Sequence, residues 1–241
     1  MFSLLGQNIR KFSFYLILVV SALVVYFTIG KPLIFDRIMI AVLFITAMIS
    51  LKIDKNIFCI VSIILFERVL EEFLWAVRSE EAWFRHLVFL CVLGICVVNW
   101  KQTVSKLALG IAMVTQGAYA YWALIEYDAP ALNWGLIMTL LTMISLTLLR
   151  KRIELWNHWV EEDSSLKLIE PDKQVNFILH LYIVLEAARL VEYLARHILN
   201  QHQMLMVYQL YPYIAHTLTG CILWIMLNES WRLVRQTRFF A

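Results

Sequence analysis

Charged residues are scarce in this sequence, since Asp, Glu, Lys and Arg make up 16% of the 241 residues and hydrophobic residues make up 61%. A soluble domain is typically about 25% charged and about 45 to 50% apolar. This shortage of charge argues against an ordinary soluble domain. The composition predicts an all-α, polytopic transmembrane helical bundle whose main partner is the lipid bilayer.

Residues that hold cofactors or form covalent frameworks are also few. The four cysteines all fall inside apolar runs, so no disulfide framework is expected; they are Cys59, Cys91, Cys96 and Cys221. The sequence contains no HExxH or paired ExxH pattern, which argues against a metal site. It also lacks a Walker A loop, a GxSxG elbow and a glycine-rich dinucleotide turn. We therefore expect no cofactor, no nucleotide chemistry and no nucleic-acid partner.

Long apolar runs, by contrast, are abundant. A run of about 17 to 25 residues is long enough to cross the hydrocarbon core of a bilayer as a helix. The chain contains eight such runs, at Phe12–Ile29, Leu33–Leu51, Ile57–Val77, Trp83–Val98, Val104–Ile125, Leu132–Leu149, Val175–Ile198 and Met204–Leu227. The first run is too long for a signal-peptide core and is not followed by a small-residue cleavage site, so we expect it to stay in the protein.

The basic residues predict the orientation of these runs, because Lys and Arg favour the cytoplasmic flanks of membrane spans. One set of alternate loops is rich in them, with Arg10, Lys11, Lys52, Lys55, Lys101, Lys106, Arg150, Lys151, Arg152, Lys167, Lys173, Arg232, Arg235 and Arg238. The other set has only Lys31, Arg78, Arg85 and Arg196, with Arg37 just inside a run. This asymmetry predicts a multi-pass protein of the cell membrane with both termini in the cytoplasm.

The only sizeable piece outside the apolar runs is the segment 150–173, on the predicted cytoplasmic side. Its sequence "RKRIELWNHWVEED" places four apolar residues on one helical face, namely Ile153, Trp156, Trp159 and Val160. Such a face is typical of an interfacial helix or of an extension of the sixth span. We expect this segment to offer a contact for a cytoplasmic protein partner.

An internal repeat is indicated by matches between the two parts of the chain. "MISL" at Met48–Leu51 recurs at Met143–Leu146, and "RVLEEFL" from Arg68 matches "RLVEYLA" from Arg189. The offset grows by about the length of the segment 150–173, as an insertion would require. We therefore expect two tandem four-helix halves, 1–100 and 101–241, with the same orientation in the membrane.

Charges inside two of the apolar runs are the strongest functional signal. Residues three or four apart share a helical face, so the charges of each run gather on one side. The third run carries Glu67, Arg68, Glu71 and Glu72, and the seventh carries Glu186, Arg189 and Glu192. Both runs start at the predicted cytoplasmic side and the charges come ten or more residues later. The two clusters are therefore expected in the outer half of the membrane.

These seven charges would be costly if they faced lipid. At about 2.5 to 3.5 kcal/mol each, the total would be roughly 20 kcal/mol, more than the net stability of an ordinary domain. They must face inward, with Arg68 pairing with Glu71 or Glu72 and Arg189 pairing with Glu186 or Glu192. Five carboxylates meet two guanidinium groups, so either some glutamates are protonated or a cavity holds a cation or water.

Two further intramembrane residues have both a structural and a functional interpretation. His216 in the eighth run could line the cavity or relay protons, and it could equally be a hydrogen-bonded histidine of the bundle. Gly117 in the fifth run is expected to permit close contact between helices.

Three functions agree with these features. The first is binding or conduction of a proton, a cation or a small cationic solute by the acidic cavity. The second is a non-catalytic membrane subunit or interaction protein, with homo-oligomers left open, in which a structural charge lattice holds the third and seventh helices together. The third is an intramembrane enzyme acting on a lipid or apolar substrate.

The enzyme alternative depends on the segment "LEEFLW" at Leu70–Trp75. Over these few residues it is similar to the paired-glutamate helix of membrane lycopene cyclases, which are also built from duplicated halves. The proline that precedes the pair in that family is replaced here by Val69 and Leu70, and the second half has only "VEY" at Val191–Tyr193. The likeness implies acid catalysis on an apolar substrate and assigns no family.

Overall fold

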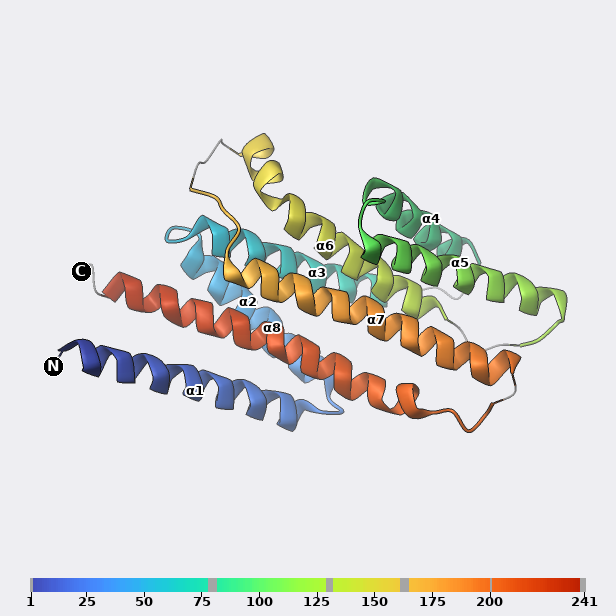
Figure 1. The fold of residues 1–241 in the computed structure, drawn as a ribbon, viewed down its shortest axis with the longest axis horizontal. Helices are drawn as coiled ribbons and strands as arrows, with labels where there is room; N and C mark the ends of the chain where they lie inside the picture. The colour runs from blue at the N-terminus through green and yellow to red at the C-terminus, as the bar shows by residue number, and fades with distance from the viewer. Residues whose placement is uncertain (1, 78–81, 129–131, 161–164, 200, 239–241) are drawn as a thin grey trace.

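The structure is a computed structural model that describes residues 2–77, 82–128, 132–160, 165–199 and 201–238 (Figure 1). In these ranges the chain forms eight α-helices and no strand. The helices are α1 (Phe2–Thr28), α2 (Pro32–Ser50), α3 (Lys55–Val77), α4 (Ala82–Val98), α5 (Thr103–Leu124), α6 (Asn133–Trp159), α7 (Glu170–Ile198) and α8 (Met206–Arg238).

Each helix occupies one of the eight apolar runs, so the predicted positions of the helices are confirmed. The breaks have local causes. Gly30 adopts φ +75° in the turn after α1, and a proline stands in the first turn of α2 and of α7, where its missing N–H costs no helical hydrogen bond. The segment that begins at Arg150 continues α6 as far as Trp159, which selects the extension over a separate interfacial helix.

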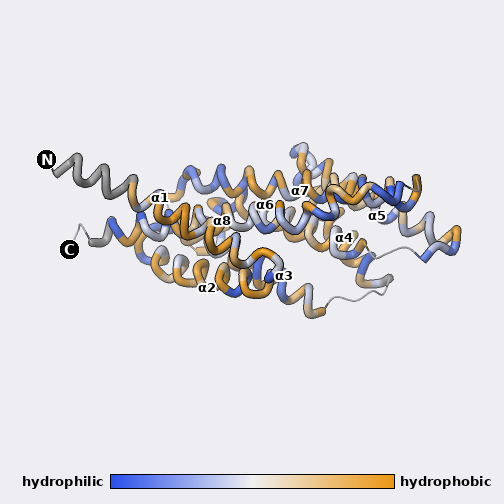
Figure 2. Tube along the Cα trace, turned by 90° about the horizontal axis from the view of Figure 1, so that it is seen from below, coloured by the Kyte–Doolittle hydropathy of each residue, from blue (hydrophilic) through white to orange (hydrophobic). Residues whose placement is uncertain are grey.

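Three of these helices are long and apolar enough to cross a membrane. They are Pro32–Ser50, Thr103–Leu124 and the stretch Met206–Arg235, and the shorter segments Phe12–Thr28 and Trp83–Val98 are apolar as well. Figure 2 shows that α2 is hydrophobic along most of its length. These features support a membrane protein with transmembrane helices.

The helices run broadly along the long axis of the molecule (Figure 1). The start of α1, the end of α8, the α2–α3 turn and the α6–α7 connection lie at one end, which we call the basic end. α8 packs against α1, α2 and α7, whereas α4 packs against α5 and α6. α3 lies against α2 and α6, and the centre is filled by fully buried side chains such as Met39, Ile60 and Leu141.

Close helix approach occurs at glycines other than the expected one. A Cβ at Gly117 would meet nothing within 4 Å, so the predicted helix contact there is wrong. A Cβ at Gly220 on α8 would collide with Val25 of α1. A Cβ at Gly135 on α6 would lie 2.5 Å from Nη2 of Arg189. Gly135 and Gly220 are therefore the positions where a missing side chain permits packing.

A buried polar network fixes the α6–α7 connection at the basic end. Arg152 is 3% exposed and donates to both oxygens of Asp172 at 2.6 Å and to the carbonyl of Lys167 at 2.6 Å. The amide oxygen of Asn56, at the start of α3, accepts hydrogen bonds from Arg152 and from the backbone N–H of Lys167. The guanidinium of Arg152 is thus paired within the fold.

The apolar face predicted in the segment 150–173 is divided between packing and exposure. Ile153 and Trp156 are half-buried, and the Trp156 ring lies 6.2 Å from that of Phe58 on α3. Trp159 and Val160 are 77% and 63% exposed. The expected contact with a cytoplasmic partner stays a prediction, and its residues 161–164 lie outside the described part of the chain.

Candidate functional site: an acidic cavity among five helices

The charges of α3 form a buried ion triplet. Arg68 donates from Nε and Nη2 to the two oxygens of Glu67, both at 2.9 Å, and its Nη1 lies 2.7 Å from Oε2 of Glu71. Glu67 and Arg68 are 4% and 8% exposed. The predicted pairing with Glu71 is confirmed, whereas the pairing with Glu67 was not expected. Glu72, the other predicted partner, is exposed and makes no ion pair with Arg68.

The charges of α7 are arranged differently along the helix. Arg189 binds Glu186 at 2.8 Å, and the hydroxyl of Tyr211 on α8 donates to the same carboxylate. The Arg189 guanidinium also lies 4.6 Å from the centre of the Tyr211 ring, a cation–π distance. Because Gly135 has no side chain, this pair lies directly against the backbone of α6.

Glu192 caps the first turn of α8. Its two oxygens accept the backbone N–H groups of Val207 at 2.6 Å and Tyr208 at 2.8 Å. A carboxylate at a helix N-terminus satisfies free N–H groups and interacts favourably with the helix dipole. Of the two partners predicted for Arg189, the structure therefore selects Glu186, and Glu192 has a role that its sequence position did not indicate.

No ion pair among the described residues joins α3 to α7, so the expected lattice between these helices is not observed there. The two clusters are separate, and the arginine of each is paired within its own helix. α7 is instead tied to α8, where the Tyr182 hydroxyl donates to the carbonyl of Ala215 at 2.7 Å and also lies against the Thr219 hydroxyl. Arg78, predicted near the outer surface, lies outside the described residues.

A cavity of about 400 Å³, here called the acidic cavity, lies beside the α3 triplet. Its walls come from α2, α3, α6, α7 and α8. Of the residues predicted for the site, Arg68, Glu71, Glu72 and His216 line it together. Its aromatic wall contains Trp75 and Trp134, whose rings meet edge to face at 4.7 Å, with Tyr182 and Tyr211 nearby. Glu67 and Glu186 are buried behind this surface.

Asp36 is a member of the cavity that sequence reasoning missed. It lies on α2, half-buried, with Arg68, Glu71 and Glu72 close enough to act on its charge. The signal was present, because Asp36 is a carboxylate inside the apolar run Leu33–Leu51. This run carries only Asp36 and Arg37, both near its start, and so it does not stand out beside the clustered charges of the third and seventh runs.

The cavity holds more negative than positive charge. Arg68 is the one guanidinium among the lining residues, and it is already bound by Glu67 and Glu71. In the part of the chain that the structure describes, neither Asp36 nor Glu72 makes an ion pair or a hydrogen bond. Two carboxylates are therefore free to accept a ligand.

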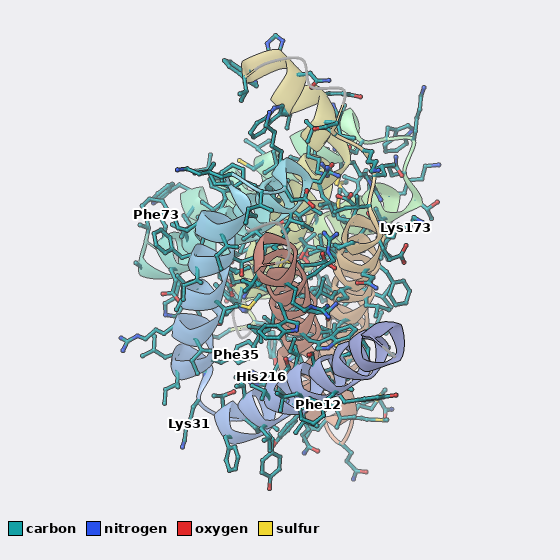
Figure 3. All side chains as sticks on the ribbon, turned by 90° about the vertical axis from the view of Figure 1, so that its left-hand side faces the viewer. Phe12, Lys31, Phe35, Phe73, Lys173 and His216 are labelled. Atoms are coloured by element: carbon teal, nitrogen blue, oxygen red, sulfur yellow. The ribbon has the colours of Figure 1, made fainter. Side chains whose placement is uncertain are left out.

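His216 occupies the boundary between α8 and the α1–α2 turn. Its Nε2 lies 3.0 Å from the Thr28 hydroxyl and 3.2 Å from the carbonyl oxygen of Val25, and its ring centre is 4.2 Å from that of Phe35. Figure 3 shows Phe35 and His216 next to each other between α2 and α8. His216 is a hydrogen-bonded histidine of the bundle that also forms part of the cavity wall.

Two further cavities lie beside the acidic cavity, toward the end opposite the basic end. The entrance groove, about 800 Å³, runs along the first turns of α8 and shares Tyr211, Pro212 and His216 with the acidic cavity. The outer cavity, about 340 Å³, shares Arg189 and Tyr208 with the entrance groove. The three cavities are therefore neighbours that share lining residues.

No family model matches the chain, and neither a curated protein nor a solved structure is similar enough to be matched. Within the described ranges no three histidine, cysteine or acidic side chains converge as metal ligands would. The function of the chain is therefore inferred from the geometry of the three cavities.

Proposed function

We propose that this chain is an eight-span membrane protein, with both termini in the cytoplasm, that binds a small organic cation in the acidic cavity and allows its passage. The observation that carries the proposal is the pair of free carboxylates, Asp36 and Glu72, beside a guanidinium that two other glutamates already neutralise. A cation would satisfy this excess of negative charge.

The depth of the site strengthens this argument. Asn56 belongs to the polar network at the basic end, and Glu71 lies fifteen residues further along α3. At 1.5 Å per residue the two are about 22 Å apart along the helix, in a hydrocarbon core of about 30 Å. Charge–charge interactions are stronger there than in water, so an uncompensated carboxylate attracts a cation more strongly.

An organic cation fits the walls better than a bare metal ion. The carboxylates of Asp36, Glu71 and Glu72 line the cavity but do not form, among the described residues, the cluster of three ligands that a metal ion would need. Trp75 and Trp134 supply aromatic surface, which attracts ammonium groups through cation–π interactions. The volume of about 400 Å³ falls within the usual range for small-molecule sites.

The tandem halves belong to the same proposal. If α1–α4 correspond to α5–α8, the packing of α8 on α1 and α2 corresponds to the packing of α4 on α5 and α6, as found. The correspondence is incomplete, because α7 packs along α8 without comparable contact between α3 and α4 in the described ranges. The charged helices α3 and α7 would then be equivalent positions of the two halves.

The test is binding of hexylammonium by the purified chain in phosphatidylcholine nanodiscs, measured by calorimetry. We expect Asp36→Asn and Glu72→Gln each to weaken binding about tenfold, or about 1.4 kcal/mol, and the double variant to abolish it. The matched control is Glu170→Gln, which removes an exposed carboxylate paired with Lys173 outside the cavity. Wild-type affinity in a folded double variant would disprove the proposal.

Passage is measured separately, as uptake of labelled hexylammonium into proteoliposomes that contain the wild-type chain or the double variant. We expect uptake to require Asp36 and Glu72. Binding without uptake would favour the second candidate, a non-catalytic membrane subunit. That alternative is supported by the exposed Trp159, Val160 and Leu168 at the basic end, which are 77%, 63% and 67% exposed and could contact a partner.

A further inference from the structure

The outer cavity contains a positively charged side chain that makes no ion pair with any described residue. Two guanidinium groups line it, those of Arg189 and Arg196. Arg189 is neutralised by Glu186 at 2.8 Å. In the described part of the chain Arg196 makes no ion pair, and its Nε is buried without a hydrogen-bond partner. Its guanidinium lies 5.7 Å from the centre of the Tyr208 ring.

The other charged and titratable groups of this cavity are already engaged. Glu192, one helical turn before Arg196, accepts the two backbone N–H groups that begin α8, at 2.6 and 2.8 Å. Nδ1 of His197 lies 2.9 Å from the hydroxyl of Tyr127. A guanidinium has five donors in a planar fork that matches a carboxylate or a phosphate. Arg196 is therefore suited to receive an anionic group from outside the protein.

The free guanidinium and the free carboxylates belong to neighbouring cavities. Trp134 lines both the outer and the acidic cavity, and the entrance groove adjoins both. Trp134 contacts Trp75 on α3, and Glu72 lies one helical turn from Trp75 toward the basic end. Arg196 lies seven residues beyond Arg189, about 10 Å along α7. Because Trp134 borders both cavities, a ligand that extends past this side chain would meet Arg196 on one side and Asp36 and Glu72 on the other.

We propose that the ligand is amphoteric, with an amine held by Asp36 and Glu72 and a carboxylate or phosphate at its other end held by Arg196. This inference rests on the proposed function, because it takes the amine site as given. It adds the second charge of the ligand. It also assigns Arg196 a role in binding. Arg68 and Arg189 do not have this role, because each is already paired with a glutamate of its own helix.

The experiment compares ligands that share a six-carbon chain: hexylammonium, hexanoate, 1,6-diaminohexane, 6-aminohexanoate and 6-aminohexyl phosphate. Binding to the full chain in phosphatidylcholine nanodiscs is measured by calorimetry. We expect the wild type to bind 6-aminohexanoate or 6-aminohexyl phosphate at least tenfold more tightly than hexylammonium, and the tighter of the two identifies the anion. Diaminohexane should gain nothing over hexylammonium.

Arg196→Gln should remove the preference for the amphoteric ligand and leave hexylammonium binding unchanged. Arg196→Lys, which keeps the charge and loses the fork, should retain part of the preference and serves if the first variant does not fold. The matched control is Arg235→Gln, which removes an arginine of α8 near the basic end whose Nε is also buried without a partner.

The outcomes separate the two proposals. Hexylammonium binding that depends on Asp36 and Glu72, with no preference for an added anionic group, would overturn the amphoteric ligand and leave the proposed function intact. A preference that survives Arg196→Gln would also overturn it. Absence of hexylammonium binding in the wild type would remove the proposed function and the inference together.

Discussion

Arg68 is surrounded by more carboxylate than it can neutralise, and this determines how its removal should act. The ion triplet with Glu67 and Glu71 is buried, at 2.7 to 2.9 Å. Breaking a buried pair by deleting one partner leaves an uncompensated charge, whereas neutralising all partners removes the problem. Stability should therefore follow the pairing of the charges and not their number.

We expect Arg68→Met to destabilise the protein by about 3 to 5 kcal/mol, because it leaves the buried carboxylate of Glu67 and the half-buried carboxylate of Glu71 without a cation. Adding Glu67→Gln and Glu71→Gln should recover much of the loss. The matched control replaces Glu67→Gln by Glu72→Gln, which should recover less because Glu72 is not bound to Arg68. Unfolding in detergent micelles measures the effect, and equal recovery by both combinations would contradict the triplet.

The sequence predicted part of this site. It identified Arg68, Glu71, Glu72 and His216, which do line one cavity, because charges inside apolar runs are rare and visible. It missed the Glu67 pairing because neighbours in a helix do not normally face each other, although the long side chain of Arg68 folds back to its neighbour. The capping role of Glu192 depends on where α8 begins. The spacing of charged residues within α7 gives no information about that position.

At the scale of the element, the apolar runs located each of the eight helices in the described ranges, but α1 begins well before its run and α6 and α8 continue well beyond theirs. The contacts between them were not predictable in the same way. Asn56, Arg152 and Asp172 come from three distant parts of the chain and meet only after packing. Close approach at Gly135 and Gly220 likewise depends on which helices are neighbours, and no local pattern distinguishes these glycines from Gly117.

The glycines provide a test of helix packing. Gly220→Ala should destabilise the protein by about 1 to 3 kcal/mol, because the added methyl group collides with Val25 and forces α1 away from α8. Gly117→Ala, at a position with open space, should be neutral or stabilising by up to about 1 kcal/mol through helix propensity. Thermal unfolding of both variants measures the difference in stability. Equal destabilisation of the two variants would contradict the α1–α8 contact.

For the molecule as a whole, the eight-span proposal predicts on which side of the membrane each connection between helices lies. Reporters fused after Arg238 and within the α6–α7 connection should both report the cytoplasm, since these points lie at the same basic end (Figure 1). A reporter after Asp128, in the α5–α6 connection, should report the outside. Fluorescent and alkaline phosphatase fusions in living cells measure this, and an external signal from the α6–α7 connection would refute the proposal.

The packing of α8 has a consequence for how the protein is made. α8 leaves the ribosome after α1 to α7, yet it packs against α1 and α2. At about 5 to 20 residues per second, translation of the chain between them takes on the order of ten to forty seconds. During that interval Thr28 and Thr46 are without their partners His216 and Ser230, which have not yet been synthesised. The contacts that α1 and α2 make with α8 can therefore form only after the other helices between them have been made.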